Sequence, residues 1–287
     1  MKKQIQVILM FTFLFSLTGC AAQKEDTKKE IYLQLYSLRD DVKEDFDKTI
    51  AAVAEMGYTG VEAAGYADGK FYGRTPAEYR AALEEVGLVS LSSHAGHNLA
   101  ENPAETDWDA VWQWWDEAIA AHKEAGMQYI VTAWMPTPAT LADLQIYCDY
   151  YNQIGEKCNA AGIRYGYHNH AFEFEEIEGE LMYDYLLQNT DPEKVFFQMD
   201  VYWTVMGGKS PVEYFQNYPG RFELLHIKDD KELGESGMVG FDAIFKHAET
   251  AGSKDFVVEV EKYNFTPLES VKKSFDYLNS ATFYPSK

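Results

Sequence analysis

The chain has 287 residues, of which 46% are hydrophobic and 25% are charged. This composition excludes a disordered acidic tail and a protein embedded in a membrane along its whole length. With 25 Lys and Arg against 46 Asp and Glu, the net charge is −21, which makes binding to nucleic acid or to an anionic lipid surface unfavourable. The length fits two domains or one large α/β barrel, and the pattern of apolar residues along the chain must distinguish between them.

Residues 1–19 are typical of a signal peptide. Two lysines precede an apolar run over residues 5–17, which ends in the sequence LTGC with its cysteine at position 20. This ending resembles the lipobox of bacterial lipoproteins, which implies lipidation of Cys20 and a chain exported and anchored by lipid to a bacterial membrane, facing the periplasm. The alternative is an ordinary secretory signal with an incidental cysteine. The polar residues 20–30 predict a flexible tether.

Five segments further along repeat one design, in which a helical stretch ends at glycine and a β-rich apolar run follows. They read EMG-YTGVEAA, EVG-LVSLSSH, EAG-MQYIVTA, AAG-IRYGYHNH and TAG-SKDFVVEVE. A glycine just after a helix supplies the left-handed conformation that ends it, and a buried parallel strand has a continuous apolar run. The repeats therefore predict helices that alternate with parallel strands.

With less regular units added, the sequence predicts eight strands and eight helices in alternation. The strands are expected at 31–37, 60–63, 88–93, 128–133, 164–169, 195–199, 222–227 and 256–260. The helices are expected at 45–56, 76–86, 108–125, 142–161, 181–189, 211–217, 242–250 and 268–278. Eight units without a central linker predict a single (β/α)8 TIM barrel over residues 31–287, rather than a doubly wound sheet.

Polar side chains collect at the carboxyl ends of the predicted strands, where barrels of this kind keep their catalytic groups. In chain order they are Gln34, Tyr36, Glu62, His94, His97, Trp134, His168, His170, Asp200, Trp203, His226, Lys228, Glu259 and Glu261. The two remaining histidines, His122 and His247, are expected on helices and facing solvent.

Four of these residues predict a divalent metal site. His168, Asp200, His226 and Glu259 come from four successive strands, so their inward-pointing side chains should converge near the barrel axis. Two imidazoles and two carboxylates suit Mn²⁺, Zn²⁺, Co²⁺ or Fe²⁺ better than Ca²⁺, whose sites are all oxygen. The alternative is a purely hydrogen-bonded polar core.

The alternation of side chains along a strand places His168 and His170 on one face, while Asn169 points away. Both imidazoles can then enter one pocket, His168 on the metal and His170 toward the substrate. Lys228 follows a ligand at the same spacing and has two open roles. It stabilises an oxyanion or donates a proton, or it forms a salt bridge with a nearby carboxylate such as Glu261.

Six segments occur in an order that is specific at superfamily level: YLQLYSLRDD, GVE, YGYHNHAFEFE, QMDVYWTVMGG, LLHIKDDK and FVVEVEKY. Together they resemble the sugar phosphate isomerase/epimerase group of the xylose isomerase-like TIM barrels, over residues 31–280. The resemblance implies a divalent ion, most often Mn²⁺, held by strand-end Glu, Asp, His and Glu. The matching positions here are His168, Asp200, His226 and Glu259.

His168 departs from that pattern, because ketose epimerases have Glu at this position. Those enzymes use the two glutamates as an acid/base pair on opposite faces of the sugar. In this chain His170 or Lys228 would have to replace one member of the pair, whereas a reaction with one base needs only Glu259.

These observations predict an exported, metal-dependent carbohydrate enzyme that abstracts a proton next to a carbonyl. Its partner would be a small non-phosphorylated sugar, and similarity to exported members suggests elimination from 3-keto glycosides. The predicted catalytic residues are Glu259, His170 and Lys228, and the predicted substrate-binding residues are Gln34, Tyr36, Glu62, His94 and Trp203. The alternatives are an aldose-ketose isomerase or epimerase acting on a free sugar, and a sugar-binding lipoprotein without catalysis.

Overall fold

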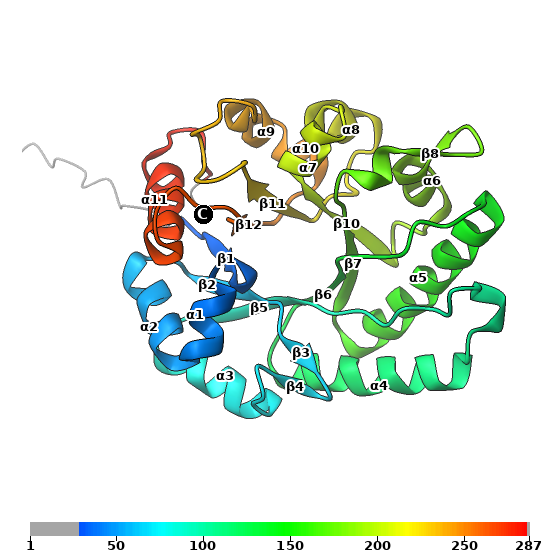
Figure 1. The fold of residues 1–287 in the computed structure, drawn as a ribbon, viewed down its shortest axis with the longest axis horizontal. Helices are drawn as coiled ribbons and strands as arrows, with labels where there is room; N and C mark the ends of the chain where they lie inside the picture. The colour runs from blue at the N-terminus through cyan, green and yellow to red at the C-terminus, as the bar shows by residue number, and fades with distance from the viewer. Residues whose placement is uncertain (1–28, 286–287) are drawn as a thin grey trace, which may run out of the picture.

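Eight parallel strands close into a barrel in the computed structural model, which describes residues 29–285 (Figure 1). They are β1 (Tyr32–Gln34), β2 (Gly60–Ala63), β5 (Val89–His94), β6 (Tyr129–Thr132), β7 (Arg164–His168), β10 (Val195–Asp200), β11 (Leu224–Lys228) and β12 (Asp255–Glu259). Strands that follow one another in the chain are neighbours, and β1 pairs with β12 to close the barrel. The predicted (β/α)8 fold is confirmed. The predicted signal peptide, Cys20 and most of the predicted tether lie outside the described residues.

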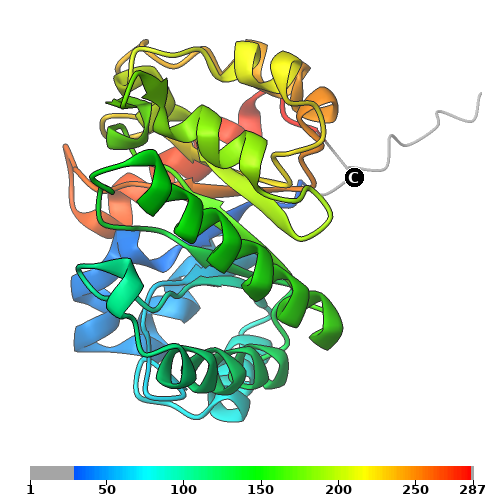
Figure 2. The ribbon, with the colours of Figure 1, turned by 90° about the vertical axis from the view of Figure 1, so that its right-hand side faces the viewer.

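Helices surround the barrel, and in Figure 2 α5 crosses one side of it with α4 beside it. They are α1 (Arg39–Glu44), α2 (Phe46–Met56), α3 (Pro76–Glu85), α4 (Trp108–Glu124), α5 (Leu141–Ala161), α6 (Met182–Asn189), α7 (Val201–Met206), α8 (Pro211–Asn217), α9 (Phe241–Lys246), α10 (Ala248–Ala251) and α11 (Pro267–Ser280). No helix within residues 29–285 has both the length and the apolar character needed to cross a bilayer.

Local signals in the sequence explain where several helices begin and end. Thr75 and Glu78 form a capping box at the start of α3, in which each side chain accepts a hydrogen bond from the other residue's backbone N–H. Gly57 and Gly162 end α2 and α5 with φ angles of 107° and 79°, a conformation that glycine adopts without a steric penalty.

The first predicted strand, 31–37, is much shorter in the structure. β1 has 3 residues, and a 3-10 turn, η1 (Leu35–Leu38), follows it and leads into α1. The Gln34 side chain accepts a hydrogen bond from the Tyr36 backbone N–H at 3.0 Å, which turns the chain out of the strand. The apolar run continues past this turn, so its pattern alone does not reveal the end of the strand.

Other short elements were also absent from the prediction. The expected helix 242–250 is divided at His247 into α9 and α10. Two hairpins, β3 (Tyr66–Ala67) with β4 (Lys70–Phe71) and β8 (Glu176–Ile177) with β9 (Glu180–Leu181), extend from the loops. Strands of 2 residues are too short to produce a detectable alternation of side chains.

The prediction that His122 faces solvent is wrong. The side chain is fully buried on α4, with Nδ1 2.6 Å from the Ala118 carbonyl oxygen. Its ring centroid lies 4.7 Å from that of Tyr66 and 4.9 Å from that of Phe71. Burial lowers the pKa of His122 to about 4, so the neutral imidazole packs as one more ring of an aromatic cluster. His247 is only half-buried.

Inside the barrel, the side chains form two layers. The lower layer is apolar and consists of Tyr32, Leu91, Tyr129, Val131, Phe196, Leu224 and Val257. The upper layer is polar and consists of Gln34, Glu62, His168, Gln198, His226 and Glu259. Because side chains alternate along a strand, positions two residues apart share the inner face. A Cβ at Gly166, two residues before His168, would meet the Phe196 ring at 2.5 Å, so this ring occupies the space of the missing side chain.

Candidate active site

The four predicted metal ligands come together at the carboxyl end of the barrel. One ligand atom from each of His168, Asp200, His226 and Glu259 lies within 4.8 Å of the other three, and all four residues are buried. Their strands β7, β10, β11 and β12 are adjacent, with Asp200 directly opposite His226 in the sheet register. His168 and His226 also form a second possible group of three with His94.

The chemistry of these side chains fits a divalent cation. His168 Nδ1, Asp200 Oδ2 and His226 Nδ1 are buried and form no close hydrogen bond among the described residues. His226 Nδ1 lies 3.5 Å from Glu259 Oε2, which belongs to another candidate ligand. Leaving such polar atoms unpaired away from water costs free energy. A cation held between them would satisfy all three atoms, and a mixed nitrogen and oxygen donor set suits Mn²⁺, Zn²⁺, Co²⁺ and Fe²⁺. That the metal is Mn²⁺ stays a prediction.

Asp200 is positioned by the start of α7. One carboxylate oxygen accepts a hydrogen bond from the Trp203 backbone N–H at 2.8 Å, as a helix cap does, which leaves the other oxygen facing the remaining ligands. The Asp200 backbone N–H donates to Asn169 Oδ1 at 3.2 Å, so Asn169 supports the site from outside the barrel interior. Burial raises the pKa of Asp200 to about 7 in the absence of a cation.

Glu62 organises the upper layer. Its carboxylate accepts hydrogen bonds from Gln34 Nε2 at 2.8 Å, Ser92 Oγ at 2.6 Å and Gln198 Nε2 at 2.8 Å. It also lies 2.6 Å from His226 Nε2. Since Nε2 is bonded to Glu62, the other ring nitrogen of His226 faces the cluster of ligands. A carboxylate behind a metal-binding imidazole fixes its orientation and tautomer.

Charge pairing keeps Glu62 ionised although it is fully buried. Burial alone would raise its pKa, but His94 and His226 hold the pKa well below the usual range of a glutamate. The two imidazoles lie 3.0 Å and 2.6 Å from the same carboxylate oxygen. Burial would lower the pKa of His226, and the neighbouring carboxylates Glu62 and Glu259 raise it to about 10 instead.

A cavity of about 230 Å³, the main cavity, opens above the ligands. Five predicted site residues line it: Tyr36, His94, His168, His170 and Glu259. The rest of its wall comes from Ala64, Ala133, Trp134 and Glu261. A metal at the four ligands would therefore lie at the wall of a space large enough for a small ligand.

The main cavity contains groups that can accept or donate a proton. His170 Nδ1 is buried without a partner among the described residues, and burial lowers the pKa of His170 to about 4, which leaves a neutral imidazole. Burial would raise the pKa of Glu259, but Lys228 and His226 lower it to about 2, so this group is a carboxylate. The Lys228 ammonium lies 2.8 Å from Glu261 Oε2 and 3.7 Å from Glu259 Oε2. The salt bridge predicted for Lys228 is thus present.

Three predicted substrate-binding residues are not part of the main cavity wall. Gln34 and Glu62 are fully buried beneath the main cavity. Gln34 donates a hydrogen bond to Glu62, and Glu62 contacts His226. Trp203 is half-buried beside His170, with ring centroids 5.9 Å apart and an indole N–H that has no partner among residues 29–285. Direct contact of these three with substrate stays a prediction.

Two residues of the site, Gln198 and Ser92, were not predicted from the sequence. Gln198 bonds Glu62 and also lies 2.8 Å from His94 Nε2, and Ser92 donates to Glu62. Gln198 precedes Asp200 by two residues on β10, so the alternation of the strand could have placed it on the inner face. Ser92 had no comparable signal, because a serine in a strand is common on either face.

Comparisons with known proteins extend over most of this fold. Residues 50–281 match the family described as Xylose isomerase-like TIM barrel. Two crystal structures from Parabacteroides distasonis, each described as a sugar phosphate isomerase/epimerase, share 36% and 35% identity with this chain. They cover 90% and 91% of this chain and 100% and 99% of their own, with TM-scores of 0.82 and 0.87.

A relative from Geobacillus kaustophilus is named inosose dehydratase. It is 24% identical over 199 residues, which correspond to 64% of this chain and to 61% of that protein. This chain therefore spans less than two thirds of the length of that relative.

Proposed function

Since the chain belongs to the xylose isomerase-like TIM barrel family, we propose that it is a metal-dependent lyase that eliminates the aglycone from 3-keto glycosides. The main support is the convergence of four buried ligand atoms beside a cavity that contains His170 and Glu259. The relative named inosose dehydratase adds support, because a dehydratase also catalyses an elimination.

The proposed reaction begins with removal of the proton at C2, which the ketone at C3 acidifies. The C2–H electron pair forms a C1=C2 double bond, and the C1–O bond breaks as the aglycone leaves and takes up a proton. A divalent cation at the four ligands would supply Lewis acidity next to the ketone. His170 and Glu259 line the main cavity and can accept the C2 proton, while the buried Lys228 ammonium balances negative charge next to Glu259.

The residue set fits elimination better than epimerisation. His168 replaces one of the two glutamates that ketose epimerases use as an acid/base pair, and here its ring offers one of the four converging ligand atoms. Elimination needs one base on one face of the sugar. It also does not need the two spaced carboxylates of a conventional glycosidase, because no oxocarbenium ion forms.

The test uses a 3-keto glucoside with deuterium at C2, incubated with enzyme and Mn²⁺. We expect release of the aglycone with a primary isotope effect, and loss of release in His170→Asn or Glu259→Gln. His247→Asn, a change of a half-buried histidine on the barrel's outside, is the matched control and should behave as wild type. Absence of aglycone release from the wild type would contradict the proposal.

An aldose-ketose isomerase or epimerase is the second candidate. The observation in its favour is the 35% and 36% identity to structures described as sugar phosphate isomerase/epimerase. In the same incubations, isomerisation of a free ketose with exchange of solvent protons would identify this activity. Sugar binding without turnover of either substrate would identify a binding protein instead.

We also propose that the chain is exported and lipid-anchored through Cys20, a position outside the described residues. The support is the sequence LTGC after an apolar run. Wild type should partition with membranes, and Cys20→Ser should release the protein into the soluble exported fraction. Equal solubility of the two would contradict lipidation.

A further inference from the structure

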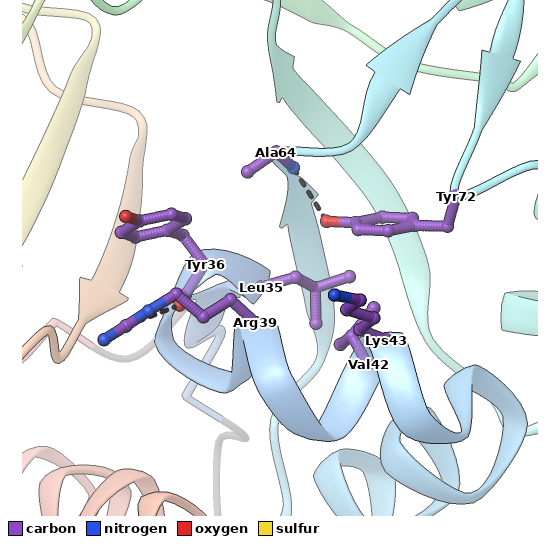
Figure 3. Close-up of a pocket in the computed structure, with 7 residues that line it drawn as sticks. All are labelled: Leu35, Tyr36, Arg39, Val42, Lys43, Ala64 and Tyr72. Carbon is purple, nitrogen blue, oxygen red and sulfur yellow. Dashed lines mark hydrogen bonds between the residues drawn. The ribbon is translucent and has the colours of Figure 1, made fainter.

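A second cavity, the side cavity, lies next to the main cavity at the carboxyl end of β1 and β2 (Figure 3). Its volume is about 310 Å³. Tyr36 and Ala64 line both cavities, so the two spaces adjoin. Ala64 directly follows β2, and Tyr36 lies in the 3-10 turn η1 that follows β1, so both are on the face where the candidate ligands lie. A molecule in the main cavity could therefore extend into the side cavity.

The side cavity is lined by cations but not by acids. Arg39 and Lys43 are four residues apart on α1, and Val42 lies between them, so one face of the helix presents all three to the space. The acidic residues of α1 do not line it, and two of them, Asp41 and Glu44, line a different hollow of the surface. In a chain with a net charge of −21, this local excess of positive charge is a distinct feature.

Neither cation is paired with an acidic side chain in the described part of the chain. Among residues 29–285, Arg39 and Lys43 form no salt bridge. Arg39 Nη1 donates to the Tyr263 hydroxyl at 2.8 Å and to the Tyr36 carbonyl at 3.3 Å, and Nη2 donates to the Glu261 carbonyl at 3.4 Å. The guanidinium lies 4.9 Å from the Tyr36 ring centre. These contacts orient the guanidinium but leave some of its five N–H groups for a ligand.

Tyr72 forms an aromatic part of the side cavity wall and is held in place by its backbone conformation and its contacts. Tyr72 has a φ of 51°, an unfavourable left-handed conformation for a non-glycine residue. Its hydroxyl accepts the Ala64 backbone N–H at 2.8 Å, and its ring occupies the space above Gly65, where a Cβ would lie 2.3 Å away. The hydroxyl hydrogen can still be donated to a ligand. Figure 3 shows the Tyr36 and Tyr72 rings on opposite sides, with Leu35 below and between them.

We propose that the side cavity binds the aglycone and selects an aromatic aglycone with a carboxylate, an inference that rests on the proposed lyase function. The volume lies near the lower end of small-molecule sites and suits a single substituted ring. The ring lies between the two tyrosines and over Leu35 and Val42. The carboxylate accepts charge-assisted hydrogen bonds from Arg39 and interacts with the Lys43 ammonium.

The first experiment measures binding without turnover. 4-Hydroxybenzoate represents the leaving group, and its methyl ester is the neutral analogue of matched shape. Calorimetry at low salt should show tighter binding of the acid than of the ester, by about fivefold to tenfold because both cations remain partly in water. The variant Arg39→Gln/Lys43→Gln should lose this difference, and circular dichroism should confirm that it folds.

The control variant is Lys123→Gln/Lys246→Gln, which changes the net charge by the same amount at two exposed positions away from the side cavity. It should keep the preference for the acid. Lys43→Gln alone, a change of an exposed side chain, should reduce the preference partly. Equal binding of acid and ester, or equal loss of the preference in both double variants, would overturn the inference.

The second experiment compares 3-keto glucosides that carry 4-carboxyphenyl or 4-carbamoylphenyl aglycones. We expect the ratio of kcat/KM for the carboxylate to kcat/KM for the carbamoyl substrate to fall in Arg39→Gln/Lys43→Gln and to stay at the wild-type value in Lys123→Gln/Lys246→Gln. The same ratio in wild type and in Arg39→Gln/Lys43→Gln would overturn the inference and leave the lyase function intact. Cleavage of neither, with selective binding of 4-hydroxybenzoate retained, would instead contradict the lyase function and the role as an aglycone site.

Discussion

The two layers inside the barrel lie on the same strands yet have opposite character. β10 passes through both: Phe196 belongs to the lower layer, Gln198 to the upper layer, and Asp200 lies among the candidate ligands. The lower layer depends mainly on apolar burial, which is not directional, although the Tyr129 hydroxyl donates a hydrogen bond to Asp255 at 3.0 Å. The upper layer needs a partner for every polar atom, and Glu62 has five such contacts.

This difference indicates a division of roles within each strand. Substitutions in the lower layer should change the free energy of unfolding, whereas substitutions in the upper layer and its ligands should change metal binding and activity. Within residues 29–285, His168 and His226 of the upper layer and the adjoining Asp200 keep buried polar atoms that a cation would satisfy. If these roles are separate, a substitution in one layer should change either the free energy of unfolding or the metal binding, but not both.

Removing a ligand should have the largest effect. His226→Ala and Asp200→Ala should each lose bound metal, and kcat/KM should fall by more than the roughly 10- to 100-fold that loss of an outer partner costs. Elemental analysis measures the metal, and circular dichroism should show that the barrel remains folded. Full metal occupancy in both variants would mean that the site lies elsewhere.

Phe196→Ala should destabilise the barrel by about 3 to 5 kcal/mol, because it removes a buried ring and opens a cavity above Gly166. Urea unfolding gives the free energy. The metal content of the folded fraction should stay at the wild-type level. Loss of metal at unchanged stability would show that the two layers do not separate in this way.

Glu173 is a buried carboxyl with no cationic partner among residues 29–285, and it offers a contrast to Glu62. It is fully buried and accepts hydrogen bonds from the Tyr167 hydroxyl and the His170 N–H, both at 2.8 Å. Burial raises the pKa of Glu173 to about 7, in contrast to the lowered pKa of Glu62. Since the pKa is higher in the folded state, the wild type should lose stability as the pH rises from about 4.5 to 7.

Glu173→Gln removes this ionisation. The stability of the variant relative to wild type should therefore rise by ~3 kcal/mol between pH 5 and pH 8, whatever its absolute stability. Glu180→Gln, at an exposed position of β9, is the control and should show no comparable trend. A flat difference between Glu173→Gln and wild type would indicate that Glu173 is ionised in the folded protein.

Glu62→Gln should have the smallest of these effects. The substitution keeps the volume but removes the charge behind His226, so metal affinity should fall by about 10- to 100-fold while the fold is retained. Competition with a metal chelator measures the affinity. An unchanged affinity would show that Glu62 stabilises the upper layer without supporting the metal site.

The sequence by itself determined the elements whose signals are local. Glycine at helix ends and continuous apolar strands predicted the eight-stranded barrel, and strand-end positions predicted the four residues that converge. These predictions succeeded because closing parallel strands in order brings their carboxyl ends to one face, whatever the details of packing.

Contacts between distant segments were decided only by the tertiary structure. Glu62 and His226 are 164 positions apart, and the roles of Gln198 and Ser92 depend on that pair. The burial of His122 and the side cavity likewise depend on loops and hairpins too short to show a period. The alternation of apolar and polar residues reveals which face of a strand or helix a residue occupies. Which side chains contact one another depends on the register of the strands and on the closure of the whole barrel.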